Sequence, residues 1–221
     1  MNFLEKTYES LKFNYNFDGV IADESFHPLV LLESKYIRYK KHNRDKGSWI
    51  CNAHSAVRKR YSSIRASVAV LAGSWSRPSL AMLRSYDVNC FVIPFEKITE
   101  FLAKRGIDFT WDEEDDAKAM TAWTKYRQLS IEEQYNIGVE MAEVVKDALC
   151  ACLEKALNNN RVREIKKVVI EILTSLGETK RFVFNTKNDA IDFLEHIELD
   201  REFDDATFLS IYDCSEEDTD E

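Results

Sequence analysis

One stretch of the sequence decides the predicted fold: PLVLLESKYIRY at residues 28–39. Its start is rich in branched apolar residues, which favour a β-strand. Side chains alternate along a strand, which gives one shared face to four residues: Leu29, Leu31, Glu33 and Lys35. A carboxylate and an ammonium at the end of an apolar face are costly to desolvate unless they meet partners. The stretch therefore predicts a strand whose charged end needs partners.

A second strand is predicted just before it, at FNYNFDGVI (residues 13–21). The turn-rich ADESFHP between the two predicts an antiparallel hairpin with a loop of about seven residues. Pairing in that hairpin can bring Asp18 beside Glu33. Two carboxylates held together repel each other, and a hard divalent cation bound through oxygens removes that penalty. Mg²⁺ typically uses one or two carboxylates plus substrate phosphate, so the hairpin predicts a magnesium site.

Helix and buried-strand patterns alternate through the rest of the first half. We expect helices at 2–12 and 52–66, a polar loop at 40–48, strands at 68–73 and 88–95, a short helix to about residue 85, and an amphipathic helix ended by Gly106. This alternation predicts an α/β (α+β) fold.

The acidic run DEEDD at 112–116 marks a predicted boundary between a core at 1–110 and a C-terminal region at 111–213. That region is expected to contain helices at 114–128 and 131–158, the second entered through a capping box of Ser130 and Glu133. A strand, a turn at Gly177, a strand, a helix at 188–197 and a strand at 207–213 follow. Residues 214–221 are predicted to form an acidic tail.

The charge distribution matters more than the net charge of −9, which alone argues against a polyanionic partner. Between residues 35 and 65 Asp45 is the only acid among ten basic residues, so the local field there is strongly positive. The five cysteines form no CxxC pair, which disfavours a zinc site or a disulfide framework. No apolar run approaches the roughly 20 residues needed to cross a bilayer, so a cytoplasmic protein without membrane contact is expected.

FDGVI, a variable loop and LLESKY together resemble the signature of the PD-(D/E)xK nucleases, which include many restriction and DNA-repair enzymes. The resemblance covers about residues 1–105 and implies a restriction-endonuclease-like core, with a central mixed β-sheet flanked by helices. A helical and α+β extension would follow this core. The pattern departs from the family in two respects, because Phe17 replaces its proline and a helix precedes the third strand.

The resemblance implies roles for the residues that match the motif. Asp18 and Glu33 would bind Mg²⁺, for which Mn²⁺ could substitute, with the Ser34 carbonyl as a further ligand. Lys35 would orient or help deprotonate the attacking water. Many members add an acidic residue from the N-terminal helix, for which Glu9 is the candidate and Glu5 the reserve.

The basic stretch predicts a surface that contacts the DNA backbone, because phosphate contacts supply affinity with little sequence information. The predicted DNA-binding residues are Arg38, Lys40, Lys41, Arg44, Lys46, His54, Arg58 and Arg65. Trp49 is expected to belong to the same DNA-contacting stretch as these basic residues. His54 and Arg58 form an i,i+4 pair on the expected polar face of the helix, where a simple solvated face is an equal alternative.

These features favour a Mg²⁺-dependent endonuclease that hydrolyses phosphodiester bonds in double-stranded DNA, of the type II restriction class or a repair type. The many apolar residues of 131–158 predict a homodimer assembled mainly through residues 115–160. One alternative is a non-catalytic nucleic-acid-binding or regulatory module that keeps the nuclease fold. Another is an acidic interaction protein whose C-terminal half is the active part. A surface-facing Glu33 and Lys35, with Asp18 in a turn, is the purely structural alternative.

Overall fold

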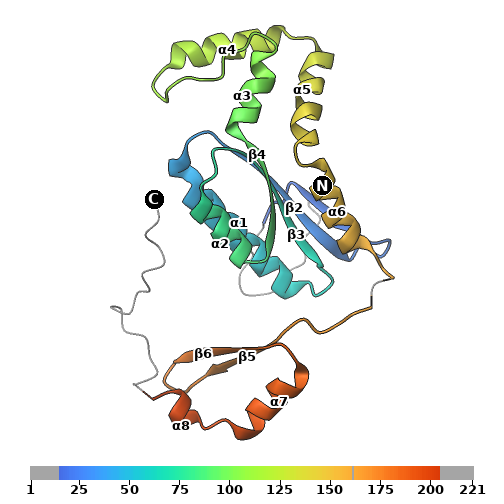
Figure 1. The fold of residues 1–221 in the computed structure, drawn as a ribbon, viewed down its shortest axis with the longest axis vertical. Helices are drawn as coiled ribbons and strands as arrows, with labels where there is room; N and C mark the ends of the chain where they lie inside the picture. Colours follow the sequence, from blue (N-terminus) through green and yellow to red (C-terminus); the bar gives the residue numbers. More distant parts are fainter. Residues whose placement is uncertain (1–14, 161, 205–221) are drawn as a thin grey trace. The chain divides into compact units, whose positions relative to one another are not determined.

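A computed structural model describes residues 15–160 and 162–204 (Figure 1). The chain divides into two compact units, with the division between Asn159 and Asn160. The sequence predicted a boundary near residue 110, but the helices that follow that point pack on the sheet of the first unit. They therefore belong to the first unit.

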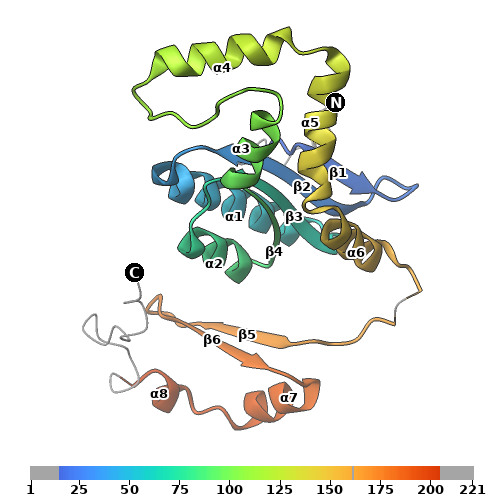
Figure 2. The same ribbon diagram turned by 45° about the horizontal axis from the view of Figure 1, so that its top comes forward.

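The first unit is built on a four-stranded sheet in the order β1-β2-β3-β4 (Figures 1 and 2). Its strands are β1 (Gly19–Ala22), β2 (Pro28–Ile37), β3 (Ala66–Gly73) and β4 (Val88–Pro94). β1 pairs with β2 antiparallel, as the predicted hairpin requires, and the other two pairings are parallel. The expected mixed sheet flanked by helices is thereby confirmed.

One face of this sheet is covered by the two helices that connect its parallel strands, α1 (Asn43–Arg60) and α2 (Arg77–Ser85). Ile50 of α1 and Leu83 of α2 are fully buried there against Leu71 of β3. Gly73 ends β3 with a φ of 97°, and a Cβ at that position would lie 2.0 Å from the Ile37 carbonyl oxygen. Only glycine fits this close approach of the two strand ends.

The start of α1 differs from the sequence prediction. The polar stretch 40–48 is not a loop, because a short 3₁₀ turn (η1, Lys40–His42) leads directly into α1, which also ends earlier, at Arg60. Asn43 is buried and donates to the carbonyls of Lys40 (2.8 Å) and Ser74 (2.9 Å). These contacts with a distant loop favour the helical start, and a sequence pattern does not contain them.

The other face of the sheet is covered by α3 (Phe95–Ala103), α5 (Ile131–Glu143) and α6 (Lys146–Leu157). α4 (Asp116–Gln128) adds Ala122 to the same apolar cluster as α3 and α5. The single helix predicted at 131–158 is therefore two helices, separated at Val144 and Val145. The break lets α5 pack beside α3 while α6 packs on β2. The predicted capping box at Ser130 and Glu133 is present.

The second unit contains the antiparallel strands β5 (Val168–Leu173) and β6 (Thr179–Phe184), joined through Gly177, then α7 (Lys187–His196) and the short α8 (Leu199–Glu202). Phe193 of α7 contacts Phe182 and Phe184 on one face of the hairpin, with ring centroids 4.4 and 5.0 Å away. The predicted strand–turn–strand–helix order is confirmed. The helix expected at 2–12, the strand at 207–213 and the acidic tail lie outside the described residues.

Within the described part of the chain, no helix combines the length and apolar character needed to cross a membrane.

Candidate functional site

The hairpin of β1 and β2 brings Asp18, Glu33 and Lys35 together. Gly19 pairs with Leu32, so Asp18 lies level with the next residues of β2, and its Oδ2 accepts a hydrogen bond from the Ser34 backbone N–H (2.7 Å). The Lys35 ammonium contacts Glu33 Oε1 and lies 3.8 Å from Asp18 Oδ2. The purely structural alternative placed Glu33 at the surface and is wrong, because Glu33 is buried.

The three groups differ in their access to solvent. Glu33 is 2% exposed, and in the described part of the chain neither of its carboxylate oxygens has a partner with normal hydrogen-bond geometry. Burial raises the pKa of Glu33, an effect that contact with the Lys35 ammonium partly offsets. The Asp18 side chain is half exposed and that of Lys35 is 30% exposed. The site is therefore shielded from solvent at Glu33 and accessible to solvent at Asp18.

The Asp18 and Glu33 carboxylates suit a hard cation that is bound by few protein ligands. Within residues 15–160 and 162–204, no group of three or more acidic, histidine or cysteine side chains could hold a metal ion. Two neighbouring carboxylates, one with unsatisfied buried oxygens, fit the Mg²⁺ habit of taking one or two carboxylates and completing its shell with water and phosphate. The Ser34 carbonyl stays a predicted ligand. Glu9 and Glu5 lie outside the described residues.

His54 is placed differently from the sequence prediction. It is completely buried rather than on a polar helix face, and among the described residues neither ring nitrogen has a hydrogen-bond partner. Its ring makes an edge contact with Phe17, the residue before Asp18, at 5.1 Å between centroids. Burial lowers the pKa of His54 to about 4, and the Arg58 charge adds to this shift. In this position the imidazole cannot contact a phosphate, so the prediction of DNA contact by His54 is corrected.

Ser67 on β3 is a buried polar residue that the sequence interpretation missed. It is fully buried, and its hydroxyl has no hydrogen-bond partner within residues 15–160 and 162–204. Ser67 pairs with Leu31, two residues before Glu33 on the same strand face, so Ser67 and Glu33 share the side covered by α1. A serine within the apolar run 66–73 was the available signal.

The predicted DNA-binding side chains fall into two groups. Lys40, Arg44 and Lys46 are exposed at η1 and the first turns of α1. Lys41 is also exposed, and its ammonium pairs with Glu113 at 2.5 Å. These four remain at the surface where a polyanion could reach them.

Two arginines of the predicted set, Arg38 and Arg65, are engaged within the chain. Arg38 donates to the carbonyls of Phe109 (3.2 Å) and Trp111 (2.9 Å), and its guanidinium lies 3.9 Å from the centroid of the Trp111 ring. Arg38 therefore anchors the segment before α4, a role that the sequence did not indicate. Arg65 donates to the Ala156 carbonyl (3.2 Å) and to the side chain of Asn159 (2.8 Å). Both side chains have a structural role besides any contact with DNA.

Arg58 is half buried, and its guanidinium approaches the Asp87 carbonyl at 3.4 Å. This contact is long for a hydrogen bond and restrains the side chain only weakly. Arg58 is therefore freer than Arg38 and Arg65 to turn toward a ligand.

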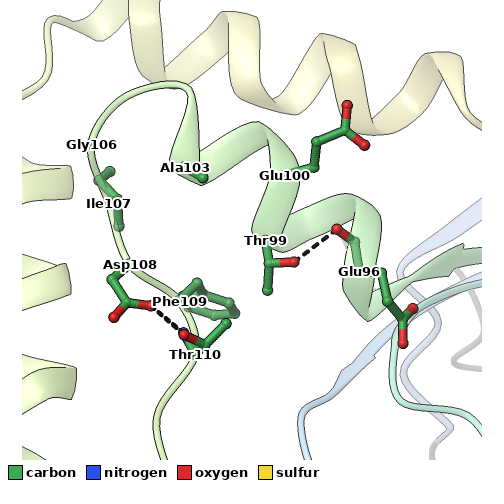
Figure 3. Close-up of a pocket in the computed structure, with 9 residues that line it drawn as sticks. All are labelled: Glu96, Thr99, Glu100, Ala103, Gly106, Ile107, Asp108, Phe109 and Thr110. Carbon is green, nitrogen blue, oxygen red and sulfur yellow. Dashed lines mark hydrogen bonds between the residues drawn. The ribbon is translucent and has the colours of Figure 1, made fainter.

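A cavity of about 510 Å³ lies elsewhere, between α3 and the segment 106–110 (Figure 3). Its lining includes three carboxylates, from Glu96, Glu100 and Asp108. Asp108 accepts hydrogen bonds from the backbone N–H (2.8 Å) and the hydroxyl (2.5 Å) of Thr110. An acidic lining repels phosphate, so this cavity does not extend the candidate site.

Comparisons with known proteins do not assign the chain to a family. No family model matches it, and no curated protein or solved structure is significantly similar to it.

Proposed function

We propose that this protein is a Mg²⁺-dependent endonuclease of the PD-(D/E)xK kind that hydrolyses phosphodiester bonds in DNA. The observation that supports the proposal best is the buried Glu33 carboxylate, whose oxygens have no normal hydrogen bonds, beside Lys35 and the half-exposed Asp18. A buried carboxylate is costly to desolvate, and the Lys35 ammonium offsets only part of this cost. A divalent cation would add further positive charge beside the two carboxylates.

In this proposal Asp18 and Glu33 hold the cation, with the Ser34 carbonyl as a further oxygen. The bound Mg²⁺ supplies a more acidic water and neutralises charge on the phosphate. Lys35 orients the attacking water and stabilises the negative charge that develops on the scissile phosphate. The open side of the site, beside Asp18, is where the phosphate enters.

The exposed cations of η1 and α1 are the proposed DNA-contacting surface: Lys40, Lys41, Arg44 and Lys46. They follow β2 directly in the chain, within eleven positions of Lys35, so a duplex bound there passes close to the site. Cleavage without contact to particular bases would suit a repair-type enzyme, and base-specific contacts from another element would suit a restriction enzyme.

A homodimer remains part of the proposal. In α4 and α5 several large apolar side chains are exposed: Met120, Trp123, Ile131, Tyr135 and Val139. Others from the predicted helix, such as Ile137 and Val145, are buried in the chain's own core. Pairing of two copies through residues 115–160 would cover the exposed set and place two single-strand-cutting sites on one duplex. Light scattering at micromolar concentration tests this, and a monomer that cuts both strands in one binding event would contradict it.

Nicking of supercoiled plasmid tests the central proposal. The wild-type protein should convert the plasmid to open-circular or linear DNA with Mg²⁺ or Mn²⁺, and EDTA should stop the reaction. The Glu33→Ala variant is the matched control for a contaminating nuclease. Salt-dependent DNA binding without cleavage would favour the non-catalytic binding module instead, and neither binding nor cleavage would contradict both.

A further inference from the structure

We propose that Trp49 is a positioning residue that keeps the Lys35 ammonium at the candidate site when the two carboxylates are committed to a cation. The inference rests on the proposed function, since it assigns to Trp49 a part in that same reaction. Its starting point is a contact between two elements, because the Lys35 ammonium lies 5.4 Å from the centroid of the Trp49 ring.

Three groups surround the Lys35 ammonium in the structure. Two are the carboxylates of Glu33, in direct contact, and Asp18, at 3.8 Å. The third is the indole of Trp49. Glu33 and Asp18 are also the candidate ligands for the cation, and a carboxylate oxygen that binds a cation is a weaker partner for an ammonium. Of the three groups around Lys35, only Trp49 is not a candidate ligand for the cation.

An indole is suited to this task. Its π face attracts an ammonium electrostatically, and tryptophan is the strongest of the aromatic residues in this interaction. The ring offers no ligand to a hard cation, which selects oxygen donors. Loading of the site therefore leaves the Trp49 contact intact, and Lys35 keeps a fixed position from which to act.

The backbone that carries Trp49 is held in place on several sides. Asn43, at the start of α1, accepts a hydrogen bond from the Ser76 backbone N–H (2.9 Å) in addition to the two that it donates. Gly47 lies so close to α2 that a Cβ there would be 2.7 Å from the Met82 methyl carbon. Ile50 is fully buried, whereas Trp49 itself is 37% exposed. The Trp49 ring therefore projects from a well-anchored turn of α1 at the edge of the core, where it is partly exposed to solvent.

NMR of the lysine side chains tests the contact independently of any nuclease activity. Reductive ¹³C-methylation keeps the ammonium charge and gives each lysine a resolved signal. The Lys35 signal, identified by its disappearance in Lys35→Arg, should be shifted upfield by the ring current of Trp49. Trp49→Leu should abolish this shift, whereas Trp123→Leu, an exposed tryptophan on α4, should leave it unchanged. A Lys35 signal at the position of an ordinary exposed lysine would overturn the inference.

Single-turnover cleavage tests the role. Trp49→Leu should lower the maximal single-turnover rate constant by about tenfold with little change in the protein concentration that gives half the maximal rate, the effect of removing an interaction of cation–π strength from the transition state. Trp49→Phe, which keeps an aromatic face, should retain most of the rate and serves as the second variant where leucine disturbs folding. Wild-type rates in Trp49→Leu would overturn the positioning role while the nuclease proposal stands. An inactive wild-type protein would overturn the nuclease proposal, and the positioning role with it, even where the NMR contact is present.

Discussion

The two faces of the four-stranded sheet differ in how they accommodate polar groups. In the described part of the chain, four residues have buried side-chain polar atoms without a hydrogen-bond partner: Glu33, Arg38, His54 and Ser67. Three of them lie on the face that α1 covers. The fourth, Arg38, donates two hydrogen bonds through another nitrogen and lies over aromatic rings.

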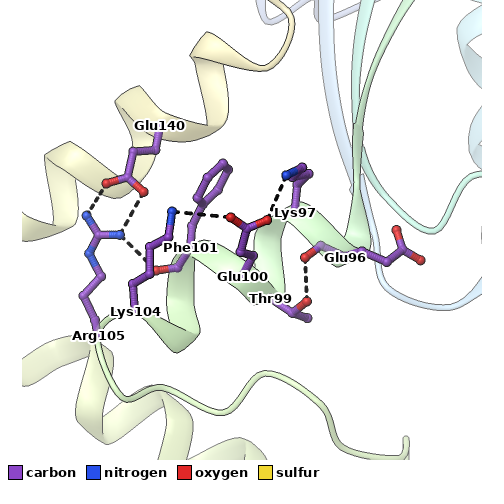
Figure 4. A network of polar contacts seen from close by, with 8 residues as sticks. All are labelled: Glu96, Lys97, Thr99, Glu100, Phe101, Lys104, Arg105 and Glu140. Atoms are coloured by element: carbon purple, nitrogen blue, oxygen red, sulfur yellow. Dashed lines mark hydrogen bonds and ion pairs between the residues drawn. The ribbon is translucent and has the colours of Figure 1, made fainter.

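On the opposite face the core is apolar and the charges near it are paired (Figure 4). Arg105, after α3, makes a bidentate contact with Glu140 of α5, at 3.0 and 2.5 Å. Glu100 of α3 pairs with Lys97 at 2.8 Å and with Lys104 at 3.5 Å. This face is arranged for stability, whereas the α1 face keeps desolvated groups that a stable fold would avoid. The proposed site therefore lies on the face that holds most of the unsatisfied buried groups.

The largest expected effect concerns catalysis. Lys35→Ala should lower the rate of Mg²⁺-dependent cleavage by on the order of 10²- to 10³-fold, because it removes a charge that acts on the transition state. DNA affinity and the fold should be largely unchanged. Lys97→Ala, which removes a lysine from the paired face, is the control and should cleave normally. Equal rates in a plasmid assay for both variants would remove the functional distinction between the two faces.

The next effect concerns DNA affinity. A Lys40→Ala/Lys46→Ala double variant should bind all DNA sequences more weakly. The slope of log affinity against log salt is negative, and it should become shallower by about 0.9 for each DNA phosphate that the variant no longer neutralises. A Lys118→Ala/Lys125→Ala variant, with both changes on α4, should keep the wild-type slope. Fluorescence anisotropy at several salt concentrations measures both. Weaker binding confined to one DNA sequence would show that η1 and α1 read bases and do not simply contact phosphates.

A third effect is a pH dependence of stability that comes from His54. Its ordinary pKa near 6.5 is lowered to about 4 in the fold, so the unfolded chain binds the proton first as the pH falls. The stability that neutral His54 contributes is therefore complete above 6.5 and is lost between 6.5 and about 4. Wild-type protein should lose about 2–3 kcal/mol more than His54→Leu across this window. Urea unfolding at both ends of the window measures the difference, and parallel pH profiles would contradict the buried neutral imidazole.

The smallest effect compares one glutamate from each face. Glu140→Gln should lower the urea midpoint modestly, because it breaks the bidentate pair with Arg105. Glu33→Gln should leave the midpoint at pH 7 unchanged or raise it, since burial raises the pKa of Glu33, which means that the fold disfavours the charged carboxylate relative to the unfolded chain. A large destabilisation by Glu33→Gln would show that Glu33 is held for structure.

The sequence determined those features that depend on neighbours along the chain. The hairpin joins segments only a few residues apart, and the alternation in β2 puts Glu33 and Lys35 on one face. The proximity of Asp18, Glu33 and Lys35 follows from these two local rules. The strand–turn–strand–helix order of residues 168–196 was likewise set by turn residues and periodicity.

Only the tertiary structure decided which side chains are desolvated and which are engaged elsewhere. His54 lies on the same helix face as Ile50 and Val57, but the predicted helix began after Ile50, so that face was not recognised. Arg38 and Arg65 are used by segments some 70 and 90 residues further along the chain, and no local pattern contains such partners. Residues 131–158 form two helices because α5 and α6 pack on different clusters. Periodicity marks what can be buried, and contacts between distant segments decide what is.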